Sequence, residues 1–264
     1  MVGKFLQKVY LSIIFIFLYA PIVVLVVFSF NDSKSRGRWG GFTLKWYADL
    51  LKSSEIRSAL YYTILVAALA AIIATIAGTF AAIGIYNMGL FGKKVMLNIN
   101  YLPVLNPDIV TGIALMLLFV SMKMQLGFIT MLISHITFNI PYVILSVMPK
   151  LKQMNKHLPE AALDLGATPF YTLRKVIIPE IMPGIITGAM MAFTLSIDDF
   201  VISFFTTGSG VSNLSIVIYS MARKGIKPSI NALSSIMFVS VILLLILINK
   251  RQSKGAESNI EKIR

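Results

Sequence analysis

The sequence predicts an all-α membrane protein with six transmembrane helices. Of its 264 residues, 57% are hydrophobic and 13% are charged, and the mean hydropathy is +0.81. A helix needs about 20 consecutive apolar residues to cross the hydrocarbon core of a bilayer, and several runs reach that length. The predicted spans cover residues 10–30, 59–86, 96–122, 126–149, 184–205 and 229–248. We interpret residues 1–264 as one transmembrane domain.

The first apolar run follows a short basic segment and is longer than the core of a signal peptide. It lacks the small-residue cleavage site that a cleaved signal requires. We therefore expect a retained first span with a cytoplasmic N-terminus.

The later spans carry two patterns that favour close packing of helices. On the second span, small residues recur every four positions, at Ala70, Ala74, Gly78 and Ala82. On the fifth, Gly184 and Gly188 form a GxxxG step. Small residues let neighbouring helices approach closely in membranes, although the stripe on the second span would also arise from the abundance of alanine. The third span is interrupted near its start by two prolines, Pro103 and Pro107.

The basic residues give the chain a net charge of +13. They lie mostly in loops and tails beside the apolar runs, where the lipid bilayer is the expected partner. Nucleic acid is therefore not predicted as a partner. Six spans place both termini on one side, and the loops of that side are rich in Lys and Arg. We predict a multi-pass protein of the cell (inner or plasma) membrane with N- and C-termini in the cytoplasm.

A polar, basic segment, residues 150–183, separates the fourth and fifth spans. Pro159 and Glu160 suit the first turn of a helix, where a missing N–H is no loss and an anion is favoured. Gly166 interrupts that helix, and Thr168 followed by Pro169 is typical of the start of a second one. The pattern predicts two short helices that protrude from the membrane as a compact surface for another protein.

The same segment carries a spaced motif, which reads Glu160, Ala161, Ala162, Gly166, Val176, Ile178 and Pro179. It resembles the EAA loop of ABC-importer permeases, with Val176 and Ile178 in place of the more usual Ile and Leu. The resemblance implies the MetI-like permease fold and makes residues 150–183 a cytoplasmic coupling loop. Glu160, Ala161, Ala162, Gly166 and Pro179 would then couple the chain to an ATPase. A generic amphipathic loop at the membrane surface is the alternative.

Three stretches, LYAPIVVLVVFSFNDS at the end of the first span, WGGFTLKWYADLL after it and SIDDFVISFFTTG in the fifth span, resemble the polyamine (spermidine/putrescine) permeases within that family. This likeness implies transport of polyamines together with a second homologous permease, a cytoplasmic ABC ATPase dimer and an extracytoplasmic polyamine-binding protein. Other small solutes such as iron, sulfate or phosphonate remain alternatives within the family. A secondary transporter or a membrane scaffold remains the alternative outside it.

Several catalytic motifs are missing from the sequence. It contains no GxxxxGK[ST] phosphate loop, no HExxH, no GxSxG and no cysteine. We therefore predict a transport subunit that is not itself an enzyme and needs no metal or other cofactor of its own. ATP would be bound by the partner ATPase. His135, in an apolar segment, and His157, in a basic loop, are interpreted as structural histidines.

Three carboxylates, Asp108, Asp198 and Asp199, lie within the predicted spans. A carboxylate at the centre of a bilayer costs on the order of 3 kcal/mol, so it usually faces a cavity or a partner. Successive helix residues point about 100° apart, so Asp198 and Asp199 cannot share one direction. One could face the pathway while the other pairs with a neighbour or caps a broken helix.

Aromatic residues accompany these carboxylates, and acidic with aromatic groups suit a slim polycation. The candidate pathway residues are Asp108, Asp198, Asp199, Phe193, Phe200 and Phe204. A purely structural role in helix packing is the alternative for the aspartates.

Overall fold

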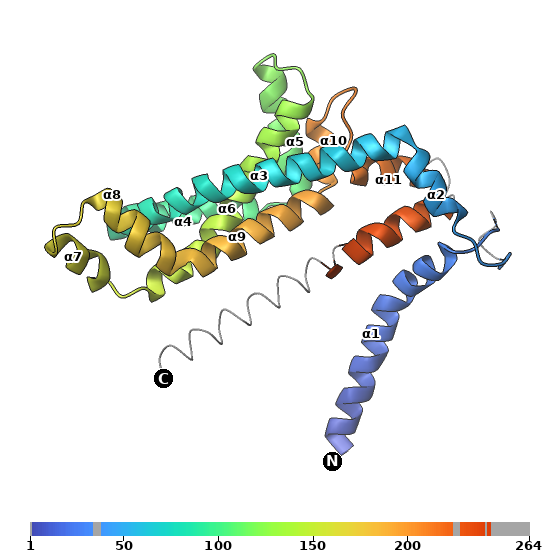
Figure 1. Ribbon diagram of the computed structural model, residues 1–264, viewed down its shortest axis with the longest axis horizontal. Coiled ribbons are helices and arrows are strands. Elements are labelled where there is room, and N and C mark those ends of the chain that lie inside the picture. The colour runs from blue at the N-terminus through green and yellow to red at the C-terminus, as the bar shows by residue number, and fades with distance from the viewer. Residues whose placement is uncertain (1, 34–37, 224–227, 241, 244–264) are drawn as a thin grey trace. The chain divides into compact units, whose positions relative to one another are not determined.

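The computed structural model describes residues 2–33, 38–223, 228–240 and 242–243 and is helical through most of them (Figure 1). In chain order the elements are α1 (Val2–Phe28), α2 (Lys45–Lys52), α3 (Ser54–Asn87), α4 (Leu90–Leu105), α5 (Asp108–Ser121), α6 (Phe128–Gln153), α7 (His157–Asp164), α8 (Pro169–Thr172), the π-helical turn η1 (Leu173–Ile177), α9 (Ile178–Asp198), α10 (Val201–Thr206) and α11 (Leu214–Arg223). Extended pairing among these residues is limited to one bridge, between Asn31 and Phe42. The all-helical prediction is confirmed for this part of the chain.

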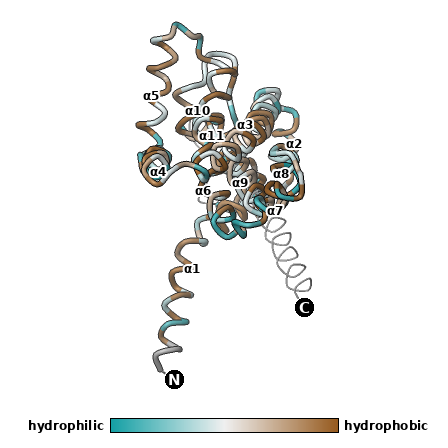
Figure 2. Tube along the Cα trace, turned by 90° about the vertical axis from the view of Figure 1, so that its left-hand side faces the viewer, coloured by the Kyte–Doolittle hydropathy of each residue, from teal (hydrophilic) through white to brown (hydrophobic). Residues whose placement is uncertain are grey.

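Four of the described helical stretches are long and apolar enough to cross a membrane: Leu6–Phe28, Ser54–Asn87, Phe128–Gln153 and Pro169–Asp198. The pair α4 and α5 would make a fifth span if it counts as one. The sixth predicted span, residues 229–248, lies partly outside the described residues. Residues 228–240 are described and helical. The six predicted crossings are therefore not confirmed as a number. Figure 2 shows apolar residues along most of α1 and α5, and polar ones around α7.

The predicted third span is not one straight helix, because α4 and α5 meet at an angle of 103°. The break lies at Asn106 and Pro107, both of which have extended backbones with ψ of 145° and 135°. A residue before proline is pushed out of the α region by the proline ring, which explains the conformation of Asn106. Pro103, the other proline predicted to interrupt the span, lies inside α4.

The chain divides into two compact units, and the first consists of residues 1–58 and 217–246. In it, the segment after α1 folds around Asn31, whose side-chain oxygen accepts a hydrogen bond from the Gly40 N–H at 2.7 Å. The Trp46 indole donates to the Asn31 carbonyl at 2.8 Å and is almost fully buried. The Ser29 hydroxyl lies 2.6 Å from that of Tyr47. These bonds fasten α2 to the end of α1.

The second unit, residues 59–216 and 247–264, contains the main hydrophobic core. Its helices α3, α6 and α9 lie side by side, with α7 and α8 at one end of the bundle (Figure 1). Both predicted small-residue patterns face α6. A Cβ added to Gly78 of α3 would lie 2.8 Å from the Val143 side chain, and one added to Gly184 of α9 would lie 2.9 Å from the Ser146 carbonyl oxygen. Ala70, Ala74 and Ala82 are fully buried.

This packing predicts different effects for two glycines of the same helix. Gly78→Ala should lower the free energy of unfolding by about 1–3 kcal/mol, because the new methyl group collides with Val143 and with the Ile140 carbonyl. Gly84→Ala is the matched control, since nothing lies within 4 Å of its added Cβ, and it should leave stability unchanged or raise it by up to about 1 kcal/mol through helix propensity. Thermal unfolding of the purified protein in detergent measures both. Equal unfolding midpoints for the two variants would contradict the close approach of α3 and α6.

Candidate coupling loop and polar network

The first candidate site is the pair of short helices α7 and α8, joined at Gly166. Gly166 has a φ of +86°, in the left-handed region. Its N–H donates to the Leu163 carbonyl at 2.9 Å, and the Ala167 N–H donates to the Ala162 carbonyl at 3.0 Å. These two bonds make a Schellman motif, which ends a helix and favours glycine at the left-handed position. The chain therefore turns sharply after α7 because residue 166 is glycine.

The second short helix begins at Thr168, as the sequence indicated. The Thr168 side chain accepts a hydrogen bond from the Tyr171 N–H at 3.3 Å, and Pro169 occupies the first helical position. From Pro169 the chain continues without a break through η1 into α9. Both α7 and α8 also contact η1. If this pair of helices moved, α9 would move with it, because α8 continues into α9. The movement would then be passed to α6, which packs against α9.

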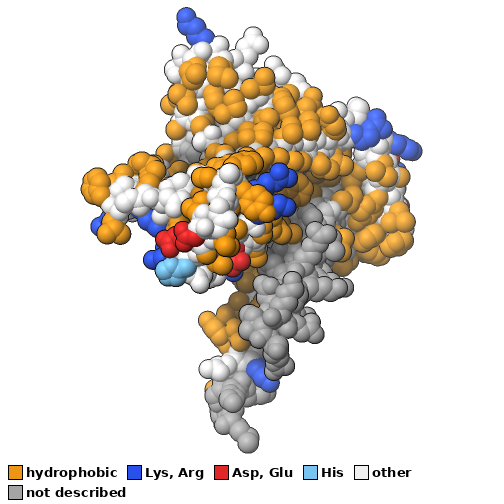
Figure 3. Space-filling view, turned by 60° about the vertical axis from the view of Figure 1, so that its left-hand side comes forward, with side chains coloured by type: hydrophobic (Ala, Val, Ile, Leu, Met, Phe, Trp, Pro, Cys, Tyr) orange, Lys and Arg blue, Asp and Glu red, His pale blue; other side chains and the backbone are white. Residues whose placement is uncertain are grey.

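The surface of this pair combines charged and apolar side chains. Glu160 and Ala161 are exposed, as are Gly166 and Pro179, whereas Ala162 is half-buried. The Glu160 carboxylate lies 3.2 Å from His157 Nδ1. Large apolar side chains stand out beside them, with exposed fractions of 89% for Leu165, 71% for Phe170 and 55% for Tyr171. Figure 3 shows acidic and basic side chains gathered next to apolar ones on this part of the face it presents. Exposed apolar side chains rimmed by polar ones are typical of an interaction surface.

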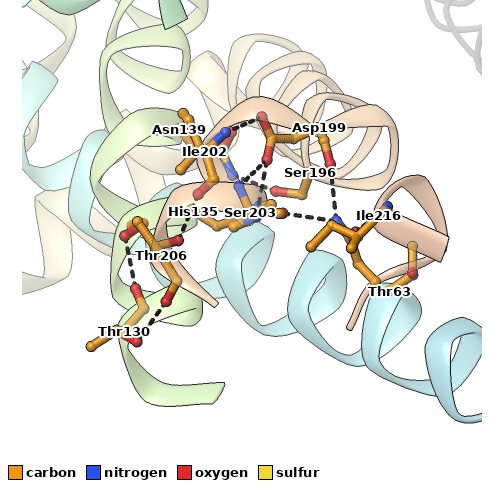
Figure 4. A network of polar contacts seen from close by, with 12 residues as sticks. Thr63, Thr130, His135, Asn139, Ser196, Asp199, Ile202, Ser203, Thr206 and Ile216 are labelled. Atoms are coloured by element: carbon orange, nitrogen blue, oxygen red, sulfur yellow. Dashed lines mark hydrogen bonds and ion pairs between the residues drawn. The ribbon is translucent and has the colours of Figure 1, made fainter. Parts of the chain in front are cut away.

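The second candidate site is a buried polar network where α6 meets α10 (Figure 4). His135 of α6 lies with Nε2 2.8 Å from the Ser203 hydroxyl and 3.5 Å from Asp199 Oδ2. The Asn213 amide donates to the same Ser203 hydroxyl at 2.7 Å and to the Asp199 carbonyl at 2.9 Å. Near the start of α6, the Thr130 hydroxyl donates to the carbonyl of Thr206 at 2.8 Å. The network fixes α10 and the start of α11 against α6.

Asp198 and Asp199 lie in different environments, as their directions on a helix require. The two Asp199 oxygens accept hydrogen bonds from the N–H groups of Ile202 at 3.2 Å and Ser203 at 2.7 Å. Asp199 thus caps α10, and its side chain is only 8% exposed. Asp198, the last residue of α9, is exposed. Of the two carboxylates, Asp198 is therefore the one with an exposed side chain.

The remaining candidates are spread over several helices. Asp108 is exposed in the first turn of α5, directly after the break at Pro107. Phe200 and Phe204 lie with ring centroids 5.3 Å apart, and Phe204 is 46% exposed. Phe193 packs against the hydrophobic core of α3, α6 and α9, so it is better placed for helix packing than for contact with a solute.

Sequence reasoning missed most of the polar network. His135 was expected to be structural, and it is buried and hydrogen-bonded. The sequence did contain a signal for a buried polar network in α6, where polar residues interrupt an apolar span at Thr130, Ser134, His135 and Asn139. Thr130, His135 and Asn139 have partners 57 to 76 residues further along the chain, a distance that no local pattern bridges.

Comparison with known proteins identifies the family of this chain. Residues 74–252 match the family described as binding-protein-dependent transport system inner membrane components. The chain belongs to this family. It is 38% identical to the spermidine/putrescine transport system permease protein PotC of Escherichia coli (strain K12), over 99% of this chain and all of the relative. The putrescine transport system permease protein PotI of the same strain is also 38% identical, over 86% of this chain and 83% of the relative.

The fold of this family member is also found in a solved structure. A chain of a bacterial ABC transporter involved in the import of alginate, an acidic polysaccharide, superposes with a TM-score of 0.78 over 94% of this chain and 96% of its own length. The two sequences are only 13% identical, so the likeness concerns the fold alone. The ABC-importer permease fold predicted from the EAA motif is confirmed at this level, and the family consists of inner membrane components of transport systems.

Proposed function

We propose that this family member is the permease subunit of an ATP-driven importer for polyamines, spermidine or putrescine. The supporting observation is the 38% identity to PotC along nearly the whole chain. The acidic and aromatic residues around Asp198 add support, because their chemistry suits a cationic and flexible substrate. The importer would contain a second homologous permease, and an extracytoplasmic binding protein would deliver the polyamine.

In this proposal the energy comes from a separate ATPase dimer, which binds the ATP. The pair α7 and α8 would dock on one ATPase subunit through the exposed side chains around Glu160, Gly166 and Phe170. ATP-driven closure of that dimer would draw the coupling loops of the two permeases together. The continuous helix from α8 to α9 supports this role, because it connects the loop to the α6 and α9 core. The coupling loop and both termini would lie in the cytoplasm.

The substrate pathway in this proposal runs past Asp198 and Asp108. Each is an exposed carboxylate at the end of a helix, and both come from the same unit. Phe200 and Phe204 follow Asp198 closely in the chain, and the exposed ring of Phe204 would offer a face to an alkylammonium group. Asp199 and Phe193 would hold the helices that carry the pathway residues.

The proposal predicts polyamine uptake that depends on an ATPase. Cells that lack their own polyamine importers would express this chain with a homologous permease, an ABC ATPase and a polyamine-binding protein from the same organism, and uptake of labelled spermidine and putrescine would be measured. We expect accumulation that stops when the ATPase is inactivated, and an ATPase subunit that purifies together with this chain. Uptake of sulfate, phosphonate or iron in place of polyamines would show that the importer carries a different solute. Polyamine uptake that survives loss of the ATPase would indicate a secondary transporter.

A further inference from the structure

A basic pocket lies where three elements of the second unit end or begin. It has a volume of about 490 Å³ and is lined by Tyr86, Asn87, Lys93, Lys152 and Lys156. Tyr86 and Asn87 close α3, Lys93 lies in the first turns of α4, and Lys152 and Lys156 stand at the end of α6 and just before α7. Three cations from separate elements thus surround one polar hollow.

The charges of this pocket are not compensated within the described part of the chain. The ion pairs there join only histidines to carboxylates, and neither includes a lysine. Lys93 is held in place, since its Nζ donates to the Tyr86 carbonyl at 3.2 Å and lies 4.4 Å from the centre of the Tyr86 ring. The helix dipole favours a lysine near a helix C-terminus, and the carbonyl of Tyr86 at the end of α3 binds Lys93. This contact engages only one of the three lysines. The pocket is therefore suited to an anion with several oxygen acceptors.

The position of the pocket favours a lipid headgroup as the source of that anion. Both α3 and α6 are long enough to cross the membrane, and both end at the pocket, so it lies at the level where these helices leave the hydrocarbon. Beside it, Leu90 and Phe91 at the start of α4 are 92% and 83% exposed. Apolar side chains this exposed suit contact with acyl chains, next to lysines that suit the phosphate.

We propose that this pocket binds the phosphate of an anionic phospholipid. The bound lipid would join the ends of α3, α4 and α6 at the base of the coupling loop, because Lys156 directly precedes α7. This inference goes beyond the proposed function. The bound phospholipid would belong to the cytoplasmic leaflet if α7 and α8 lie in the cytoplasm, and that placement alone rests on the proposed function.

Native mass spectrometry of the purified, delipidated transporter complex tests the site. Dioleoyl phosphatidylglycerol would be titrated against dioleoyl phosphatidylcholine, and the lipid retained by the complex would be counted. We expect retention of the anionic lipid to weaken about fivefold in Lys152→Gln and about a hundredfold in the triple variant Lys93→Gln, Lys152→Gln and Lys156→Gln, since each basic residue near a surface contributes about fivefold. Phosphatidylcholine binding should change little.

The control variant carries Lys94→Gln, Lys123→Gln and Lys175→Gln, which remove the same charge outside the pocket. It should retain the lipid as the wild type does, and a triple Lys→Arg variant of the pocket should restore most of the binding. Equal retention by the pocket and control variants would overturn the site. If inorganic phosphate alone displaced the lipid, and the complex showed no preference for phosphatidylglycerol over phosphatidylcholine, the pocket would be a site for free phosphate. That result would overturn the proposal of a lipid site. Loss of the ATPase subunit from the pocket variant with unchanged lipid retention would assign the lysines to carboxylates of that subunit instead.

Discussion

Replacing Gly166 with valine should abolish polyamine uptake while the amount of protein in the membrane stays unchanged. Residue 166 has a φ of +86°, where an ordinary L-residue costs about 1–2 kcal/mol and a β-branched one more. Nothing lies within 4 Å of an added Cβ, so the effect comes from the backbone and not from a collision. The Schellman motif would open and α8 would leave its place beside α7. Because this pair of helices is separate from the hydrophobic core, the transmembrane helices should remain folded.

Two further substitutions separate this mechanism from a general defect. Gly166→Asn should keep part of the uptake, because asparagine tolerates the left-handed conformation better than other residues. Gly89→Val is a control in another short connection, where φ is −59° and nothing lies within 4 Å of the added Cβ. Uptake of labelled spermidine and quantitative immunoblots of membrane fractions give the two readouts. Normal uptake by Gly166→Val would remove the turn from the coupling mechanism, as would an equal loss in Gly89→Val.

The two short helices α7 and α8 could be predicted from the sequence because their structure is determined locally. Pro159 and Glu160, the glycine that ends α7 and the threonine that caps α8 lie within a dozen residues, and each acts on its own backbone. The predicted start was two residues late, because α7 begins at His157 and Pro159 is its third residue. Likewise, the small-residue patterns of α3 and α9 are regular enough to indicate a packing face. What they could not indicate is the partner, since both patterns meet the same helix, α6, near Val143.

The third span shows where hydropathy stops being informative. Residues 96–122 are apolar enough for one crossing, but the backbone turns by 103° at Asn106 and Pro107. Apolar composition indicates that a segment is surrounded by lipid or protein, but it does not indicate the direction in which the backbone runs. The local backbone is determined here by Pro107, which excludes the helical conformation at the residue before it. Two prolines were visible, and only the second breaks the helix. Pro103 lies inside α4, so a proline alone did not locate the bend.

The roles of Asp198 and Asp199 likewise required three-dimensional information. Helical geometry showed that the two side chains diverge, but the cap on α10 depends on the end of α9 at Asp198, and the contact with His135 depends on residues 64 positions away. The difference between an exposed carboxylate and a buried capping one leads to opposite expectations for transport and stability.

Asp198→Asn should lower spermidine uptake about ten- to a hundredfold without lowering the unfolding midpoint. In the proposed pathway the exposed carboxylate pairs with an ammonium group, and a hydrogen bond to a charged group is worth about 1.5–3 kcal/mol. The neutral amide keeps the size of the side chain but loses the charge. Glu55→Gln, which removes one negative charge from another exposed position, should leave uptake close to that of the wild type.

Asp199→Ala should show the reverse order of effects, with loss of stability first. It removes both acceptors of the Ile202 and Ser203 N–H groups, and leaving buried donors unpaired costs about 1–3 kcal/mol each. Asp199→Asn keeps one acceptor and should be milder, since asparagine is also a good helix cap. Thermal unfolding in detergent together with uptake per folded molecule measures both quantities. Normal uptake by Asp198→Asn would contradict the role of Asp198 in the pathway. Loss of uptake by Asp199→Ala with an unchanged unfolding midpoint would contradict the structural role of Asp199, because removing a structural carboxylate must lower the stability of the protein. In either case the two assignments would have to be exchanged or abandoned.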